Sequence, residues 1–283
     1  MNIRVRLHRS RSWRKFRRKR LAVLSLVVIV LMYGLSLSAN VWVSHDPEEV
    51  DILLRFAGPS WWHLFGTDEM GRDAFARIVY GGRVSLSVGT AAMVLAITLG
   101  SLVGAVAGFW GGAADAVLMR ITESMLSIPV FFFVIVTLAI LGSSLMNVIL
   151  VISLTSWMAT ARIVRSEVLR NKELDYVMAA RVIGCSGPRV LFRHALPQVF
   201  PSIIVSGTLG VAYAILIESA LSFLGLGVQP PTPSWGNMLT GAQSYLWKSP
   251  MLVVYPGALI FLCVLMFNAL GDGLRDALDP TLQ

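Results

Sequence analysis

Residues 21–43 read "LAVLSLVVIVLMYGLSLSANVWV" and form a run of 23 residues without a charged side chain. About 20 apolar residues in a helix are enough to cross the hydrocarbon core of a membrane. Residues 36–38, Ser-Leu-Ser, also resemble the cleavage site of a secretory signal peptide, because a basic segment precedes the run. The run is long for a signal peptide and further apolar runs follow it, so we interpret it as the first transmembrane helix.

The segment before this run, residues 1–20, is a basic arm. It holds ten of the 24 Lys and Arg residues of the chain, whose formal net charge is +8. A basic segment could bind nucleic acid, but a cluster of cations directly before a membrane helix is typical of a cytoplasmic anchor that contacts lipid headgroups. We therefore expect membrane lipid as a partner and no nucleic acid.

The rest of the chain has the composition of an integral membrane protein. Hydrophobic residues make up 55% of it and charged residues only 14%. Five more apolar runs follow the first, at 84–108, 117–142, 146–168, 199–224 and 251–271. The sequence therefore predicts an all-α integral membrane protein with six transmembrane helices, five of them in a core domain over residues 84–275.

The distribution of basic residues predicts how the chain crosses the membrane. With the N-terminus inside, the inner segments carry 19 Lys and Arg residues and the outer segments five. Because basic residues gather on the cytoplasmic side, we expect both termini in the cytoplasm. Residues 44–83 then form an external loop, and residues 169–198 and 276–283 form a cytoplasmic loop and tail.

The cytoplasmic loop contains the polar and basic stretch "DYVMAARVIGCSGPRVLFRHALP" at residues 175–197. Its pattern predicts a helix over 173–183, a break at 184–187, and a second helix that begins with Pro188 and ends at Pro197.

One face of the first predicted helix of this loop carries small residues. Ala180 and Gly184 lie four residues apart, and Ala179 adjoins them. A face with so little bulk lets another protein surface approach closely, but it could equally pack against helices of the same chain. The residues alone leave both interpretations open.

This loop resembles the cytoplasmic loop of ABC-importer permease subunits, whose pattern is Glu-Ala-Ala, three residues, Gly, nine residues, Ile, one residue, Leu-Pro. The residues that match with the right spacing are Ala179, Ala180, Gly184, Leu196 and Pro197. Met178 stands where the family often has Glu, and His194 stands where it often has Ile. Without the Glu, this chain lacks a partner for a salt bridge to an ATPase, whereas docking through small residues is unaffected.

Three further stretches make the resemblance sharper. They are "GTDEMGRDAFARIVYGGRVSLSVG" (66–89), "SFLGLGVQPPTPSWGNML" (222–239) and "FNALGDGLRDALDP" (267–280). They are similar to the dipeptide, oligopeptide and nickel branch of these permeases, and within it to the subunit with a short first external loop. The resemblance implies a type I ABC importer permease fold in the bacterial inner membrane.

The resemblance also implies partners. These are a second, homologous permease subunit, two cytoplasmic ABC ATPase subunits that bind ATP and Mg, and an external solute-binding protein. In the family the cytoplasmic loop inserts into a cleft of an ATPase, so the matching residues together with Met178 are the expected coupling site. Peptides are the commonest substrates of the class, and nickel is the alternative.

The sequence offers no catalytic machinery of its own. It has no G-x-x-x-x-G-K-[ST] phosphate loop, so we expect ATP hydrolysis by partner subunits and no cofactor in this chain. The four histidines, His8, His45, His63 and His194, lie outside the predicted spans, so no facing pair is available for haem or a buried metal. We expect neither catalytic residues nor a metal site.

Charged residues within the predicted spans are the remaining candidates for function. Glu218 lies late in the fifth span, where a charged group usually faces a water-filled pathway or a partner. Glu218 either lines the outer end of a pore or reaches the membrane interface and pairs structurally, and the sequence leaves both interpretations open. Arg120 and Glu123, three residues apart on one predicted helix, could form a structural ion pair. An ion-coupled secondary transporter would need a relay of such groups, which the spans lack apart from Glu218.

Overall fold

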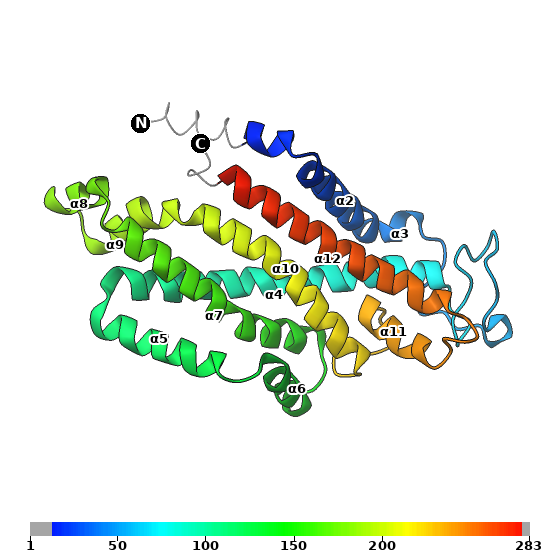
Figure 1. Cartoon of the computed structure of the whole chain (residues 1–283). Helices are drawn as coiled ribbons and strands as arrows, with labels where there is room; N and C mark the ends of the chain where they lie inside the picture. Colours follow the sequence, from blue (N-terminus) through cyan, green and yellow to red (C-terminus); the bar gives the residue numbers. More distant parts are fainter. Residues whose placement is uncertain (1–12, 279–283) are drawn as a thin grey trace.

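The computed structural model describes residues 13–278, and the regular elements in that range are helices (Figure 1). The long helices are α2 (Arg20–Leu37), α4 (Ala74–Trp110), α7 (Leu145–Asn171), α10 (Phe200–Phe223) and α12 (Met251–Leu278). The shorter ones are α3 (Ala39–Trp42), η1 (Ile52–Leu54), α5 (Gly112–Leu126), α6 (Val130–Leu141), α8 (Asp175–Val182), α9 (Gly187–Val190), η2 (Leu191–Ala195), η3 (Leu196–Gln198) and α11 (Trp235–Gln243). The first part of the predicted basic arm, with His8, and the end of the predicted tail lie outside the described residues.

The long helices have the dimensions of membrane spans. Five of them, α2, α4, α7, α10 and α12, are long and apolar enough to cross a membrane, and α5 and α6 together make a sixth candidate. The predicted all-α membrane fold is therefore confirmed.

The predicted span 117–142 is not one straight helix. The chain turns by 85° between α5 and α6. The cause is Pro129, which precedes α6 with an extended ψ of 117°. Proline lacks a backbone N–H and disfavours a helical conformation in the residue before it, so a continuous helix cannot pass this point.

Helix α4 begins ten residues before the predicted start of its span. The side chain of Asp73 accepts a hydrogen bond of 2.6 Å from the backbone nitrogen of Ala76, which caps the helix. The end of the predicted external loop 44–83 is therefore helical. The prediction from hydropathy missed these turns, because Arg77 and Arg83 interrupt the apolar run.

The closest helix contact in the bundle joins α4 and α7. Gly100, Gly104 and Gly108 lie four residues apart on one face of α4. A Cβ atom on any of them would overlap backbone carbonyl groups of α7 between residues 157 and 165. Since only glycine allows this approach, the two helices touch along their backbones and form one unit.

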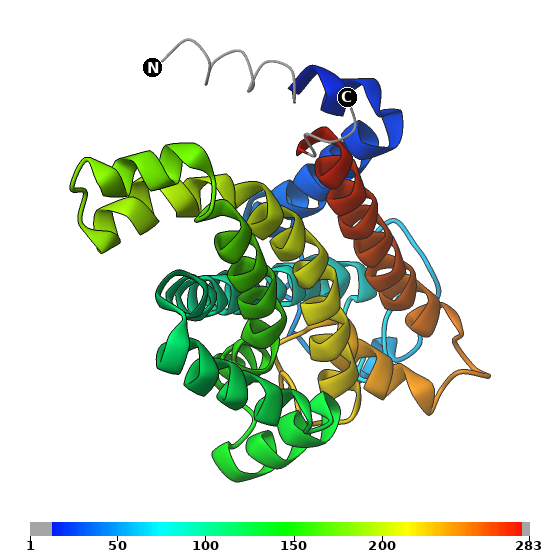
Figure 2. The same ribbon diagram turned by 60° about the vertical axis from the view of Figure 1, so that its left-hand side comes forward.

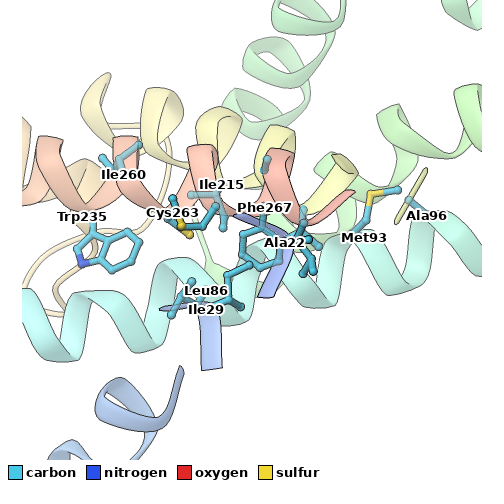
Figure 3. Close-up of a cluster of buried hydrophobic side chains, with 14 of the residues drawn as sticks. Ala22, Ile29, Leu86, Met93, Ala96, Ile215, Trp235, Ile260, Cys263 and Phe267 are labelled. Atoms are coloured by element: carbon cyan, nitrogen blue, oxygen red, sulfur yellow. The ribbon is translucent and has the colours of Figure 1, made fainter. Parts of the chain in front are cut away.

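The main core lies where α2, α10, α11 and α12 cover α4. Figure 3 shows this cluster, with the labelled side chains Ala22, Ile29, Leu86, Met93, Ala96, Ile215, Trp235, Ile260, Cys263 and Phe267, all of them buried. The described part of the basic arm is attached to the same bundle, because Phe16 is buried in this cluster and Lys19 forms an ion pair with Asp276 of α12.

The predicted external loop packs as a cap on one end of the bundle. Asp68 is buried and bonds to two arginines, Arg72 at 2.7 Å and Arg77 at 3.4 Å. The ring of Phe56 lies 4.8 Å from that of Tyr245, which ties the loop to the segment before α12. The loop is thus fixed by buried ion pairs and aromatic contacts.

Candidate functional site

The predicted cytoplasmic loop is a pair of short helical arms at the end of the bundle opposite the cap (Figures 1 and 2). Its first arm is α8, close to the predicted helix over 173–183. The break after α8 depends on Gly184, whose φ of +86° lies in the left-handed region that glycine adopts without strain. No atom lies within 4 Å of the position that a Cβ of Gly184 would occupy. The turn therefore needs glycine for its conformation and leaves open space around it.

The second arm runs without a break into α10. Pro188 lies in the first turn of α9, as predicted. The prediction that Pro197 ends the second helix is wrong. The chain passes through a wide π turn, η2, and a tight 3-10 turn, η3, and α10 begins at Phe200. Pro197 lies in the first turn of η3, where its missing N–H is not required. The arm is thus directly connected to a membrane helix.

The inner face of the loop holds the two arms together. Val177 and Ala180 of α8 pack against Val190 of α9 in a small buried cluster, which Phe109 at the end of α4 borders. The guanidinium group of Arg181 lies 5.1 Å from the centre of the Phe109 ring. Ala180, one of the residues matched to the permease pattern, therefore packs inside the chain.

The outer face of the loop is exposed and apolar. Ala179 and Met178 lie on it, and Val182 and Ile183 are 86% and 80% exposed. These adjoining large apolar side chains have no packing partner in the described part of the chain. The small-residue face predicted from the sequence is therefore divided, since Ala179 and Gly184 are exposed and Ala180 is not. We refer to residues 178, 179, 182, 183 and 184 as the outer loop face.

The pattern of small residues in the sequence did not indicate Val182 and Ile183. The available signal was a pair of β-branched residues directly before a glycine in a polar loop.

The remaining matched residues connect the loop to the bundle. Leu196 is half-buried against a cluster that includes Val164 and Val168 of α7, whereas Pro197 is exposed. Tyr176 donates a long hydrogen bond, 3.5 Å, to the backbone oxygen of His194. Loss of solvent around the phenol raises the pKa of Tyr176, so at neutral pH the hydroxyl remains a donor.

An ion pair fixes the bundle directly beneath the loop. Arg165 of α7 binds Asp115 of α5 through two contacts, of 2.5 Å from Nε and 2.6 Å from Nη2. This two-pronged geometry is the strongest that the pair can form. The predicted ion pair between Arg120 and Glu123 is not present among the described residues, and both side chains are exposed.

Glu218 lies inside the chain near the other end of α10. It is fully buried, and its carboxylate accepts hydrogen bonds from Ser85 of α4 at 2.9 Å and from Ser222 at 2.8 Å. The Ser85 oxygen in turn accepts a 3.2 Å bond from the backbone N–H of Trp235, the first residue of α11. Glu218 thus joins three helices in this conformation. That it lines a pore stays a prediction.

His45 and His63 contribute to the structure of the cap. The rings of His45 and His63 lie 5.0 Å apart, and His63 Nδ1 lies 2.8 Å from a carboxylate oxygen of Asp73, the residue that caps α4. Among the described residues, no group of three His, Cys, Asp or Glu side chains is placed to hold a metal ion.

Two family models match the chain. The model described as binding-protein-dependent transport system inner membrane component matches residues 85–283. The model described as the N-terminal TM domain of oligopeptide transport permease C matches residues 9–59. The first match contains the whole loop with its outer face, Glu218 and α11.

Curated relatives align over nearly the whole chain. The dipeptide transport system permease protein of Alkalihalophilus pseudofirmus is 40% identical over 96% of this chain and 90% of its own length. The oligopeptide transport system permease protein of Bacillus subtilis is 39% identical over 95% and 88%. The nickel transport system permease protein of Escherichia coli is 38% identical over 92% and 94%.

A solved structure shares the fold. The crystal structure of an amino acid ABC transporter with histidines superposes with a TM-score of 0.54, covering 71% of this chain and 94% of that one. The sequences are 14% identical, so the likeness concerns the arrangement of helices alone.

Proposed function

The chain belongs to the family of binding-protein-dependent transport system inner membrane components, and from this premise we propose that it is a permease subunit of an ATP-driven importer of di- or oligopeptides. The observation that carries the proposal is the outer loop face, a projecting apolar surface at one end of a membrane bundle. Relatives named for dipeptide and oligopeptide transport support the substrate class. The relative named for nickel transport makes nickel the second candidate.

In this proposal the chain forms half of a translocation pathway and a homologous permease subunit forms the other half. Two cytoplasmic ATPases bind and hydrolyse ATP with Mg, so this chain is not catalytic. Both termini lie in the cytoplasm. The excess of basic residues on the loop side and in the arm supports this orientation in the bacterial inner membrane.

The loop transmits movement of the ATPase to the membrane helices. Val182 and Ile183 insert into a cleft of the ATPase, where burying their apolar surface stabilises the contact. The second arm continues through η2 and η3 into α10. A displacement of the loop therefore reaches α10 and, at its far end, the contact between Glu218 and Ser85.

The opposite end of the chain receives the external binding protein. The Asp68 ion pairs fix the loop that forms the cap to the start of α4, so the cap presents a shaped surface. Ile52 and Trp61 are 75% and 96% exposed there. A preformed apolar surface is suited to a partner that binds and leaves repeatedly, because little order is lost on binding.

Capture of partners tests the proposal. The tagged chain is purified from its native membrane in mild detergent and analysed by mass spectrometry. We expect a second multispan permease and an ATPase with a phosphate loop to copurify. Ile183→Asp should lose the ATPase and keep the second permease. Ile52→Asp, an equally exposed apolar position at the opposite end, should keep both. Retention of the ATPase by Ile183→Asp would show that the outer loop face is not its docking site.

Uptake measurements test the energy source and the substrate. Vesicles with the complete complex should accumulate a labelled dipeptide or oligopeptide only when ATP and the binding protein are supplied. Accumulation in ATP-depleted vesicles under an imposed ion gradient would make the protein a secondary transporter. Uptake of chelated nickel without peptide uptake would assign the second candidate substrate.

A further inference from the structure

Helix α5 carries a stripe of exposed polar side chains. Arg120, Glu123, Ser124 and Ser127 follow one another at spacings of three, one and three residues, so they share one face of the helix. The opposite face is packed, because Thr122 is buried and Met125 and Leu126 pack against the main core. Because the opposite face is packed, the stripe points away from the bundle.

The charged part of this stripe lies within the first two turns of the predicted span 117–142, at its cytoplasmic end. Arg120 is eight residues beyond Gly112, where α5 begins, which corresponds to about 12 Å along the helix axis. The hydrocarbon core of a bilayer is about 30 Å thick. The start of α5 is held beside the loop end of the bundle by the ion pair between Asp115 and Arg165. The stripe thus runs inward from the proposed cytoplasmic surface.

Within the described part of the chain, neither charge of the stripe has a contact ion pair, although Glu123 attracts the guanidinium group of Arg165 at longer range. Neither Arg120 nor Glu123 forms an ion pair or a side-chain hydrogen bond with another described residue. A charged group facing hydrocarbon is costly, and such groups in membrane segments face water or a protein partner. Helix α6, beyond the bend, is instead apolar all round, and its exposed Phe132 and Ile140 are suited to lipid. The bend at Pro129 therefore separates α5, whose exposed surface combines the polar stripe with Val117 and Ile121, from the apolar α6.

We propose that the polar stripe of α5 borders the water-filled solute pathway and that Arg120 and Glu123 contact the two opposite charges of a zwitterionic solute. Arg120 would bind the carboxylate and Glu123 the ammonium group. Side chains three residues apart on a helix have Cβ atoms about 5–6 Å apart. Because both side chains are flexible beyond Cβ, their charged groups can reach the roughly 7 Å that two extended residues of a peptide span. This inference rests on the proposed function and names the part of the chain that meets the peptide.

Thiol labelling tests whether the stripe faces water. Ser124→Cys keeps both charges and replaces one small exposed side chain by another, and Glu123→Cys probes the charged position itself. Inside-out vesicles with the complete complex are treated with a membrane-impermeant cationic methanethiosulfonate, and the labelled residue is identified by mass spectrometry, so native Cys185 and Cys263 stay in place. Ile140→Cys, 78% exposed on α6, is the lipid-facing control. We expect labelling of residues 123 and 124 at least tenfold faster than that of residue 140.

The outcomes separate the inference from the proposed function. Labelling of residue 124 as slow as that of residue 140, in vesicles that still import peptide with ATP, overturns the inference and leaves the function intact. A helix of the second permease covering the stripe would give this result. Rapid labelling without any ATP-driven peptide uptake by the wild-type complex would overturn the function instead.

Modified peptides test the assignment of charges. We expect Arg120→Gln to raise the KM for a peptide with a free carboxylate about tenfold and to leave the KM for its C-terminal amide unchanged. Glu123→Gln should raise the KM for a peptide with a free amino terminus about tenfold and leave the KM for the N-acetylated peptide unchanged. An equal change for free and blocked peptides would overturn the pairing of each residue with one terminus.

Discussion

The hydroxyl group of Ser85 on α4 lies 2.9 Å from the carboxylate of Glu218 on α10, although 133 residues separate them in the sequence. The hydroxyl oxygen of Ser85 also accepts a hydrogen bond from the backbone N–H of Trp235. One serine therefore links a buried carboxylate to the start of a third helix. This contact holds the cap end of the bundle together.

Removing the carboxylate should therefore destabilise the fold. We expect Glu218→Ala to lower the free energy of unfolding by about 3 kcal/mol, because it leaves a cavity and two serine hydroxyls without an acceptor. Glu218→Gln keeps the volume, and the serine hydroxyls can rotate to suit the amide, so its loss should be about 1 kcal/mol. Thermal unfolding in detergent measures both. The exposed Glu173→Ala is the control, and a loss at Glu173 as large as that at Glu218 would contradict the prediction.

We expect a substitution that adds a side-chain atom at the backbone contact between α4 and α7 to destabilise the fold. A Cβ at Gly104 would overlap the carbonyl oxygen of Ala161, whereas nothing lies within 4 Å of a Cβ at Gly34 of α2. We expect Gly104→Ala to lower the free energy of unfolding by about 2 kcal/mol, as overpacking does elsewhere. Gly34→Ala should change it by less than about 0.5 kcal/mol. Equal melting temperatures for the two variants would mean that the helices can separate without loss.

The ion pair between Asp115 and Arg165 should show measurable coupling. A double-mutant cycle with Asp115→Asn and Arg165→Gln is expected to give about 1 kcal/mol, because the pair is two-pronged and partly shielded from water. The pair of Glu167 and Arg170 on α7 is a control, with the arginine side chain 71% exposed. Its coupling should be about 0.3 kcal/mol. The prediction fails if the exposed pair couples as strongly as the shielded one.

Two substitutions at Gly184 separate backbone strain from surface bulk. Both Gly184→Ala and Gly184→Arg place a side chain at a φ of +86°, which costs about 1–2 kcal/mol. Only the arginine adds size and charge to the outer loop face. We expect the alanine variant to retain most peptide uptake. The arginine variant should remain in the membrane, lose uptake and leave ATP hydrolysis uncoupled. Parallel assays of uptake and ATPase activity measure this, and wild-type uptake by Gly184→Arg would show that the loop does not transmit ATPase movement.

The spans with uninterrupted apolar runs were predictable from sequence. The runs 146–168 and 199–224 correspond to α7 and α10 within a few residues. The start of α4 was not predictable from hydropathy. Arg77 and Arg83 interrupt the apolar run, and hydropathy does not detect the helix cap at Asp73. The bend at Pro129 was readable in principle, since a proline inside a predicted helix ends or kinks it.

The candidate site was predictable in position but not in orientation. The family pattern located the loop and its residues, whereas the inward direction of Ala180 depends on Val190 and Phe109, which come together only in the folded chain. The partners of Glu218 were likewise beyond prediction, because Ser85 and Trp235 approach it through tertiary packing and no sequence spacing encodes that.

The join between the loop and α10 has a mechanical consequence. Between Val190 and Phe200 the hydrogen-bonding pattern changes from α to π to 3-10 and back to α, and these turns contain different numbers of residues. A helix that gains or loses one residue at such a join rotates everything beyond it by about 100°. We therefore expect a force on the loop to rotate α10 about its own axis, with little movement along that axis.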